Sequence, residues 1–219
     1  YGYREIDLLG GKDPYSASKA GAEIIFSSYF RSFLKEKKDL GICTARAGNV
    51  IGGGDWAVDR IVPDTIRSWS SNSPAILRNP NSTRPWQHVL EPLSGYLLLA
   101  HKLYNNEISD NGSSFNFGPS SDVIKSVEDL IDEMSKFWKD SSKNLPEKSH
   151  NYNESSLLKL NCDKALKELS WQPTLTFDET AKFTVDWYLA NQNQNNIKDF
   201  TSSQIDQYQK IMFERNKLQ

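Results

Sequence analysis

Cysteine is scarce in this sequence, and long apolar runs are absent. The 219-residue chain has two cysteines, Cys43 and Cys162, which are too few for a disulfide framework and lack the spacing of metal ligands. No stretch is long and apolar enough to span a bilayer. We therefore expect a reduced, cytoplasmic protein that needs no metal and does not enter a membrane.

An excess of charge of one sign is also missing. The 26 lysines and arginines nearly balance the 28 aspartates and glutamates, which leaves a formal net charge of −2 at pH 7. No broad electrostatic field would then attract the protein to nucleic acid or to an anionic membrane surface. Hydrophobic residues make up 37% of the chain and charged residues 25%, as in an ordinary globular protein of one domain or slightly more.

Residues 13–19 carry the strongest chemical signal. Asp13 is a good N-cap and Pro14 suits a first helical turn, so the pair predicts a helix that begins at Pro14 or Tyr15. Tyr15 and Lys19 would then lie at positions i and i+4 on one helix face. A nearby ammonium group favours a phenolate, which can take a proton from a substrate hydroxyl or return it. A bare Tyr-x-x-x-Lys pattern also fits a half-buried tyrosine and a solvated lysine.

Three runs of sequence carry a resemblance to a known family. Residues 10–20 (GGKDPYSASKA) resemble the catalytic helix of the extended short-chain dehydrogenase/reductases that act on nucleotide-activated sugars. Residues 45–56 (ARAGNVIGGGDW) and 78–92 (RNPNSTRPWQHVLEP) resemble the CDP-glucose 4,6-dehydratases within that family. The resemblance extends from about residue 3 to residue 188.

The resemblance implies a lyase reaction assisted by NAD. Tyr15 would deprotonate the sugar 4-hydroxyl while the hydride from C4 passes to NAD, water would be lost across C5 and C6, and the hydride would return to C6. The substrate would be CDP-glucose, and the product, CDP-4-dehydro-6-deoxyglucose, would serve deoxysugar and lipopolysaccharide biosynthesis. Tyr15, Lys19 and Ala47 are the residues that the resemblance places against the cofactor.

A glycine-rich dinucleotide-binding turn is not found in the sequence. No G-x-G-x-x-G motif follows a strand, and the glycines at 52–54 come after the catalytic helix. Such a turn presents backbone N–H groups to the pyrophosphate of a dinucleotide. The chain also begins with Tyr1 rather than with methionine. We therefore expect it to be the C-terminal part of a longer protein, inactive alone, with the elimination acid and base upstream.

Arginines at loop ends are the candidates for holding a diphosphate, because a guanidinium binds phosphate oxygens in a bidentate way. By resemblance, Arg84 matches the phosphate-contacting arginine of the family, and Arg60 and Arg78 are further candidates for the phosphates or the cytosine. The amide of Asn49 can donate to a phosphate oxygen. Glu154 lies in a segment that resembles the family's late substrate-contacting loop, at a position where many relatives carry arginine.

Helix and strand patterns alternate along the chain and predict an α/β fold. We expect the second half of a Rossmann-like doubly wound parallel sheet, with a smaller C-terminal substrate-binding lobe. Its divisions would be 1–58 for the cofactor domain, 59–190 for the substrate lobe and 191–219 for a polar linker and tail. Helices are expected at 15–37, 59–70, 91–104, 126–138, 163–169 and 177–190, strands at 41–46, 75–78, 87–89 and 115–117, and a loop at 140–156.

Several alternatives stay open. The 15–37 helix has a wide apolar stripe, which either pairs with its copy in a homo-oligomer, as the family implies, or covers only its own sheet. His88 lacks a nucleophilic partner, so a structural or substrate-contacting role is expected. The function could also be that of a nucleotide-sugar epimerase of the same fold. A catalytically idle sugar-nucleotide-binding protein is the third reading, although the intact Tyr15 and Lys19 argue against it.

Overall fold

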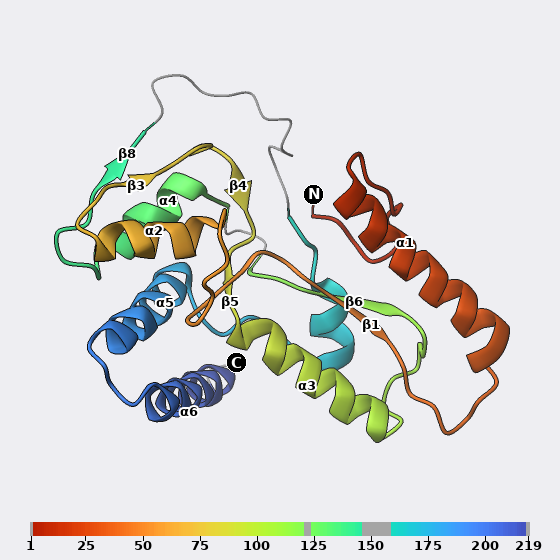
Figure 1. The fold of residues 1–219 in the computed structure, drawn as a ribbon. Helices are drawn as coiled ribbons and strands as arrows, with labels where there is room; N and C mark the ends of the chain where they lie inside the picture. The colour runs from red at the N-terminus through yellow and green to blue at the C-terminus, as the bar shows by residue number, and fades with distance from the viewer. Residues whose placement is uncertain (1, 121–123, 146–158, 218–219) are drawn as a thin grey trace.

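The computed structural model describes residues 2–120, 124–145 and 159–217 (Figure 1). Short strands and longer helices alternate along these residues. In chain order the elements are α1 (Pro14–Tyr29), the π-helical turn η1 (Phe30–Leu34), β1 (Thr44–Ala47), β2 (Val50–Ile51), α2 (Ile61–Ser70), β3 (Ala75–Ile76), β4 (Thr83–Arg84), β5 (Gln87–His88), α3 (Leu90–Tyr104), β6 (Ser114–Phe117), β7 (Lys125–Ser126), α4 (Val127–Ser135), β8 (Lys143–Asn144), the π-helical turn η2 (Ala165–Leu169), α5 (Phe177–Gln192) and α6 (Ile197–Asn216).

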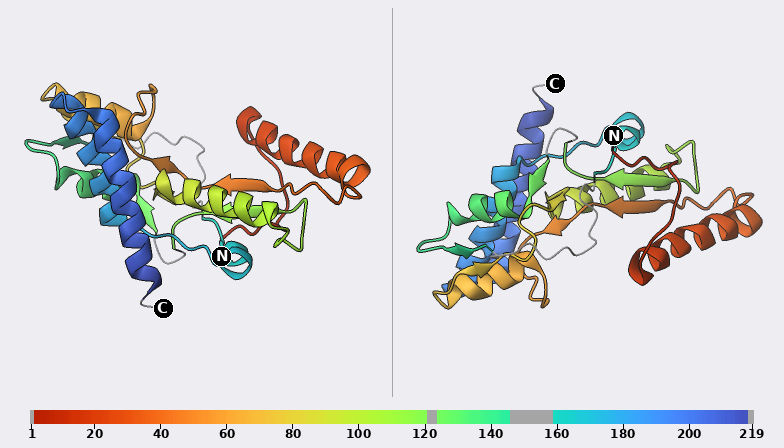
Figure 2. Two further views of the ribbon diagram at one scale, coloured as in Figure 1. Left: turned by 90° about the horizontal axis from the view of Figure 1, so that it is seen from below. Right: turned by 90° about the horizontal axis from the view of Figure 1, so that it is seen from above.

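Parallel pairing dominates the strands. β1 pairs with β6 in parallel, β2 with β5 and β3 with β8 do the same, and β4 with β7 is antiparallel. α1 and α3 lie on opposite sides of the β1–β6 pair (Figures 1 and 2). Helices on both faces of parallel strands are the arrangement of a doubly wound α/β fold, so the predicted fold class is confirmed.

Two clusters of buried apolar side chains hold the elements together. The larger one joins α2, α4 and α5 with β3, and its fully buried members include Ile66, Leu77 and Tyr188. The smaller one lies between α3, β6 and η2 and is built around Phe115 and Phe117. The larger core therefore packs α2, α4 and α5 together, and the smaller core backs the β1–β6 pair.

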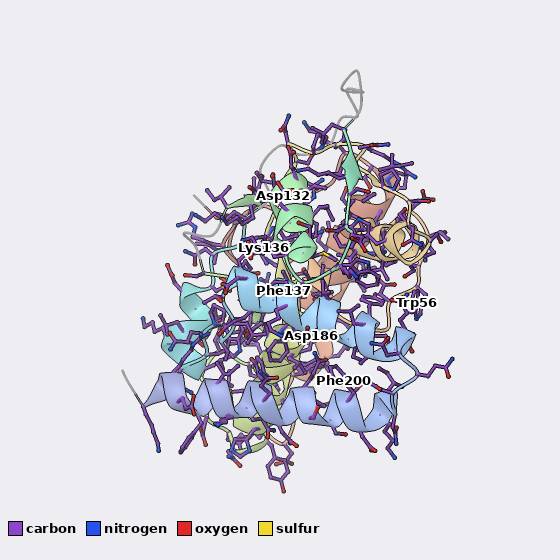
Figure 3. All side chains as sticks on the ribbon, turned by 90° about the vertical axis from the view of Figure 1, so that its left-hand side faces the viewer. Trp56, Asp132, Lys136, Phe137, Asp186 and Phe200 are labelled. Carbon is purple, nitrogen blue, oxygen red and sulfur yellow. The ribbon has the colours of Figure 1, made fainter. Side chains whose placement is uncertain are left out.

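The helix α6 packs along α5, where the sequence indicates a polar tail. Figure 3 shows α4, α5 and α6 in succession, with Phe137 two residues after the end of α4 and Phe200 on α6. Tyr208 of α6 is 3% exposed, and its hydroxyl donates to Oε2 of the buried Glu91 at 3.0 Å. Gln204 Nε2 donates to the carbonyl of Phe183 at 2.8 Å. Polar groups thus attach α6, which is why its sequence looks like an exposed segment.

Some predicted boundaries differ from the observed ones. The strand expected at 41–46 is Thr44–Ala47, because the N–H of Ile42 donates to the Asn111 side chain at 2.8 Å instead of to a strand. The expected loop at 140–156 contains β8, which pairs with β3. The long N-terminal helix ends as η1 at Leu34 rather than at residue 37. Within the described ranges, no helix combines the length and apolar character that crossing a membrane requires.

Candidate functional site

The start of α1 is capped as the sequence predicts. Asp13 Oδ1 accepts the backbone N–H groups of Tyr15 and Ser16, both at 3.0 Å, and Pro14 occupies the first turn. The hydrogen bond from the Ser16 hydroxyl, with those from the backbone N–H groups, lowers the pKa of the Asp13 carboxyl. An ionised cap at the positive end of the helix dipole stabilises this first turn. The cap therefore sets where the helix begins and hence which face Tyr15 occupies.

Tyr15 and Lys19 lie on one face of α1, as predicted from their spacing. Lys19 Nζ is 5.8 Å from the centroid of the Tyr15 ring, within the range of a cation–π contact. The tyrosine is 72% exposed and the lysine is exposed as well. Both side chains are thus open to a ligand that approaches this end of the helix.

Glu23 continues this face and connects it to the sheet. It follows Tyr15 and Lys19 at the next i+4 position, and its carboxylate accepts both Nε of Arg46, at 2.8 Å, and Nη2, at 2.5 Å. The Ser114 hydroxyl also donates to Glu23, at 3.3 Å. Because α1 runs opposite to β1 (Figure 1), the N-terminal end of the helix lies near the C-terminal end of β1. The ion pair therefore turns the Tyr15–Lys19 face toward the edge where ligands of parallel sheets bind.

A cavity of about 660 Å³ opens beyond β2 and collects most of the predicted substrate residues. Its wall is formed by residues 49–53, the first turn of α2 and the chain around β3 and β4. Four predicted residues line it: Asn49, Arg60, Arg78 and Arg84. Spread over 36 positions of sequence, these side chains are brought together by the fold.

The cavity has a mixed electrostatic lining. Arg60 is the N-cap of α2, so the unpaired N–H groups and the positive dipole end of that helix face the same space. Arg78 Nη2 pairs with Asp59 Oδ1 at 2.7 Å, and Arg84 Nη1 donates to the carbonyl of Thr83 at 2.8 Å. Asp59 has a φ of +60°, a left-handed conformation that is strained for a residue other than glycine. Three guanidinium groups and a helix N-terminus suit an anionic ligand.

His88 is a buried structural residue beside this cavity. It is 3% exposed, and burial lowers its pKa to about 4. Its Nδ1 accepts the N–H of Leu90 at 3.3 Å, and its ring meets that of Phe183 edge to face at 5.6 Å. A pKa this low makes the imidazole a weak base, and burial keeps it from a ligand, so the structure favours the structural alternative over the substrate-contacting one.

The remaining predicted residues lie elsewhere. Tyr15 and Lys19 do not line the cavity, and Ala47 is exposed at the end of β1, opposite Phe117. Ala47 precedes Asn49 by two residues and so connects the β1 edge with the cavity wall. Glu154 falls outside the described residues.

Sequence reasoning missed three acidic residues of the lining, Asp55, Asp59 and Asp64. It also missed two aromatic residues of α5. Trp187 contacts Gly53 and Gly54, and the Tyr188 hydroxyl donates to the carbonyl of Asp55. Three consecutive glycines are a usable signal, since they indicate a backbone that something approaches closely. Nothing in the pattern indicates which segment approaches.

Comparison with known proteins shows which family the chain resembles. The family model described as GDP-mannose 4,6 dehydratase matches residues 2–184. The CDP-glucose 4,6-dehydratase of Salmonella typhimurium is 45% identical over 194 residues, which cover 87% of this chain and 54% of that protein. This chain thus spans about half the length of that relative.

Solved structures show the same fold. The dTDP-glucose 4,6-dehydratase of Bacillus anthracis, in complex with NAD, superposes with a TM-score of 0.69 at 21% identity, over 89% of this chain and 58% of that one. The UDP-glucuronic acid 4-epimerase of Bacillus cereus, in complex with UDP-glucuronic acid and NAD, gives 0.69 at 19% identity, over 86% and 56%. With the motif resemblance confirmed by the family match, the chain belongs to the GDP-mannose 4,6 dehydratase family.

Proposed function

We propose that this chain provides the substrate pocket and the proton-transferring tyrosine of an NAD-dependent CDP-glucose 4,6-dehydratase. The observation that carries the proposal is the cavity that gathers Asn49, Arg60, Arg78 and Arg84. The 45% identity to the Salmonella enzyme supports the choice of CDP-glucose over other nucleotide sugars. The reaction would take place in the cytoplasm, and its product would serve deoxysugar synthesis.

The cavity suits a nucleoside diphosphate sugar in size and charge. A volume of about 660 Å³ lies within the usual range of small-molecule pockets. The diphosphate would lie at the N-terminus of α2, where Arg60, Arg78 and Arg84 compensate its charge. Asp59 now pairs with Arg78, so binding would exchange that carboxylate for a phosphate oxygen. Asn49 would donate its amide to a phosphate or sugar oxygen.

The exposed end of α1 suits the chemical step. Tyr15 is open to ligands, Lys19 lies beside its ring, and the small side chain of Ala47 leaves space at the end of β1. These three residues would contact NAD, which accepts the hydride of C4 and returns it to C6. Tyr15 would take the proton of the 4-hydroxyl, and Lys19 would stabilise the phenolate. The pyrophosphate-binding turn and the elimination acid and base would come from a segment that corresponds to the rest of the relatives' length.

Isothermal titration of CDP-glucose into the purified chain tests this function. We expect CDP-glucose to bind, since the cavity lies within this chain. We expect dTDP-glucose, UDP-glucose and GDP-glucose to bind more weakly. NAD should not bind at micromolar concentration, because no phosphate-cradling glycine turn is present in the sequence. Equal affinity for CDP-glucose and dTDP-glucose would overturn the assignment of the substrate.

The variant Arg84→Ala checks the same assignment at one residue. It should weaken CDP-glucose binding by about 1.5–3 kcal/mol, or roughly 10-fold to 150-fold in Kd, as for a hydrogen bond to a charged group. Arg31→Ala is the matched control, because Arg31 is an exposed arginine of η1 away from the cavity. An unchanged Kd for Arg84→Ala would remove this arginine from the binding site.

We also propose that the protein is a homo-oligomer through the 15–37 helix. The outer surface of α1 and η1 exposes four large apolar side chains, Ile24, Ile25, Tyr29 and Phe33, each more than half exposed. Such a contiguous apolar surface typically marks an interface. A second copy of the same helix would cover it, since a two-fold axis pairs identical patches.

The variant Ile25→Glu should therefore shift the protein toward monomer in light scattering after size exclusion, because burying an unpaired carboxylate at an apolar interface is unfavourable. Leu97→Glu, at a 73% exposed leucine on the outer face of α3, serves as the control and should leave the mass unchanged. A mass that Ile25→Glu leaves unaltered would mean that this surface pairs with something other than its own copy.

A further inference from the structure

The glycine run that lines the cavity rests directly on an aromatic side chain of α5. A Cβ atom at Gly53 would lie 2.0 Å from Cγ and 2.1 Å from Cδ2 of Trp187, so the glycine backbone is in contact with the indole. Gly54 has a φ of +83°, which side-chain-bearing residues rarely adopt. Gly52 and Gly53 both line the cavity. The indole therefore supports the wall against which a ligand would lie.

The next residue of α5 holds the following segment of the same wall. The Tyr188 hydroxyl donates to the carbonyl of Asp55 at 2.7 Å, and Asp55 also lines the cavity. The Trp56 ring meets the Tyr188 ring edge to face, with centroids 5.1 Å apart. Tyr188 is 1% exposed, and burial raises its pKa to about 12, so its hydroxyl stays protonated and keeps donating. Trp187 and Tyr188, two adjacent residues of α5, thus contact the loop from Gly53 to Trp56 and hold it in place.

The helix α6 fixes the indole in turn. Trp187 Nε1 donates to the Thr201 hydroxyl at 2.9 Å, and that hydroxyl donates to the carbonyl of Ile197 at 2.7 Å. Figure 3 shows Trp56 and Phe200 toward the same end of α5, where the chain turns into α6. The helix α6 therefore supports the cavity wall indirectly, because it holds the Trp187 indole that contacts this wall.

We propose that Trp187 and Tyr188 are positioning residues that hold the 52–56 loop in the shape the nucleotide-sugar pocket requires. The identity of the ligand rests on the function proposed above, but the loop contacts do not. Both residues lie beyond residue 184, where the family match ends.

The physical reason is pre-organisation. Three consecutive glycines have more conformational freedom than other residues, and ordering them at the moment of binding would cost affinity. The indole surface and the hydrogen bond to Asp55 order the loop before the ligand arrives. Removing the support should then weaken binding without removing any group that touches the ligand.

Two readouts test the proposal: the Kd of CDP-glucose by calorimetry, and amide hydrogen exchange of residues 52–56. Gly53→Ala should raise the Kd about tenfold, since its Cβ forces the loop off the indole. The double variant Gly53→Ala/Trp187→Ala should bind better than Gly53→Ala alone, because the obstructing ring has gone. Trp187→Ala and Tyr188→Phe should each speed exchange within 52–56 while the rest of the core keeps its protection. Tyr188→Phe retains the ring, so the core stays packed.

Gly21→Ala is the matched control for the added methyl group, because a Cβ at that position meets no atom within 4 Å. It should leave the Kd and the exchange of residues 52–56 at their wild-type values. Wild-type Kd values in both Gly53→Ala and Trp187→Ala would overturn the inference and leave the proposed function intact. Failure of the wild-type chain to bind any nucleotide sugar would overturn the function instead. Unchanged exchange at 52–56 in Trp187→Ala and Tyr188→Phe would overturn the inference whatever ligand binds.

Discussion

Replacing Tyr15 by phenylalanine should slow the redox step about 100-fold to 10,000-fold, which is the usual contribution of general acid–base catalysis to a reaction rate. The ring and the cap at Asp13 remain, because the cap uses the backbone N–H of residue 15. The change removes the hydroxyl that would exchange a proton with the sugar 4-hydroxyl. CDP-glucose affinity should change little, since Tyr15 does not line the cavity. The assay follows formation of the 4-keto product by an enzyme assembled from this chain and the part of the Salmonella relative that the match does not cover.

Tyr104→Phe provides the control for this experiment. Tyr104 is the last residue of α3 and is 86% exposed, so the variant removes a comparable hydroxyl from a position without a lysine four residues later. Its rate should match that of the unaltered enzyme. Near-normal product formation by Tyr15→Phe would show that another group takes the proton, and the dehydratase mechanism would then be wrong for this protein.

Local signals account for what the sequence predicted well. The cap at Asp13, the turn at Pro14 and the spacing of Tyr15 and Lys19 depend on residues within one helical turn, and all three appear in the structure as expected. The capping box of Ser126 and Asp129 at the start of α4 is another such case. Helix starts are encoded by a few neighbouring side chains, so they can be read without knowing the fold.

Long-range pairing explains what the sequence could not show. β8 has two residues, too few for a periodic pattern, and its partner β3, at a strand that the sequence predicted, lies almost 70 positions earlier. Tyr208 reaches Glu91 across more than a hundred residues and attaches a helix whose composition looks like a tail. The contact of Gly53 with Trp187 is equally remote. Such contacts follow from how the elements pack, which no local window contains.

The candidate site falls between these two cases. Arg84 was identified by motif resemblance, with Arg60 and Arg78 as further candidates, and the structure supplies the fact that they share one cavity. Asp59 pairs with Arg78, and the carbonyl of Thr83 accepts a hydrogen bond from Arg84. Backbone geometry, including the positive φ at Asp59, places these two partners. Residue types are therefore predictable from the sequence here, whereas the balance of charge inside the cavity is not.

Lowering the pH from about 7.5 to 4.5 should cost the folded state roughly 2.5 kcal/mol through His88 alone. Its pKa falls from 6.5 to about 4 on folding because burial penalises the imidazolium. The unfolded chain then binds the proton more readily below pH 6.5. The stability contribution is fully present above pH 6.5 and is lost as the pH falls toward 4. Urea titrations at several pH values measure it.

The slope of stability against pH should flatten in His88→Asn, whose side-chain oxygen can still accept the N–H of Leu90 and does not titrate. His101→Asn, at an exposed histidine of α3, removes one imidazole without touching the core and should keep the wild-type slope. Burial raises the pKa of Glu91, so this carboxyl favours the folded state as the pH falls over part of this range. Its effect on stability opposes that of His88, and for this reason the slopes of the variants and the wild type are compared. Carboxyls with lowered pKa, such as Asp129, lose their contribution only below about pH 4 and so fall outside the window. Equal slopes in His88→Asn and the wild type would mean that His88 is already charged, or solvated, in the folded protein.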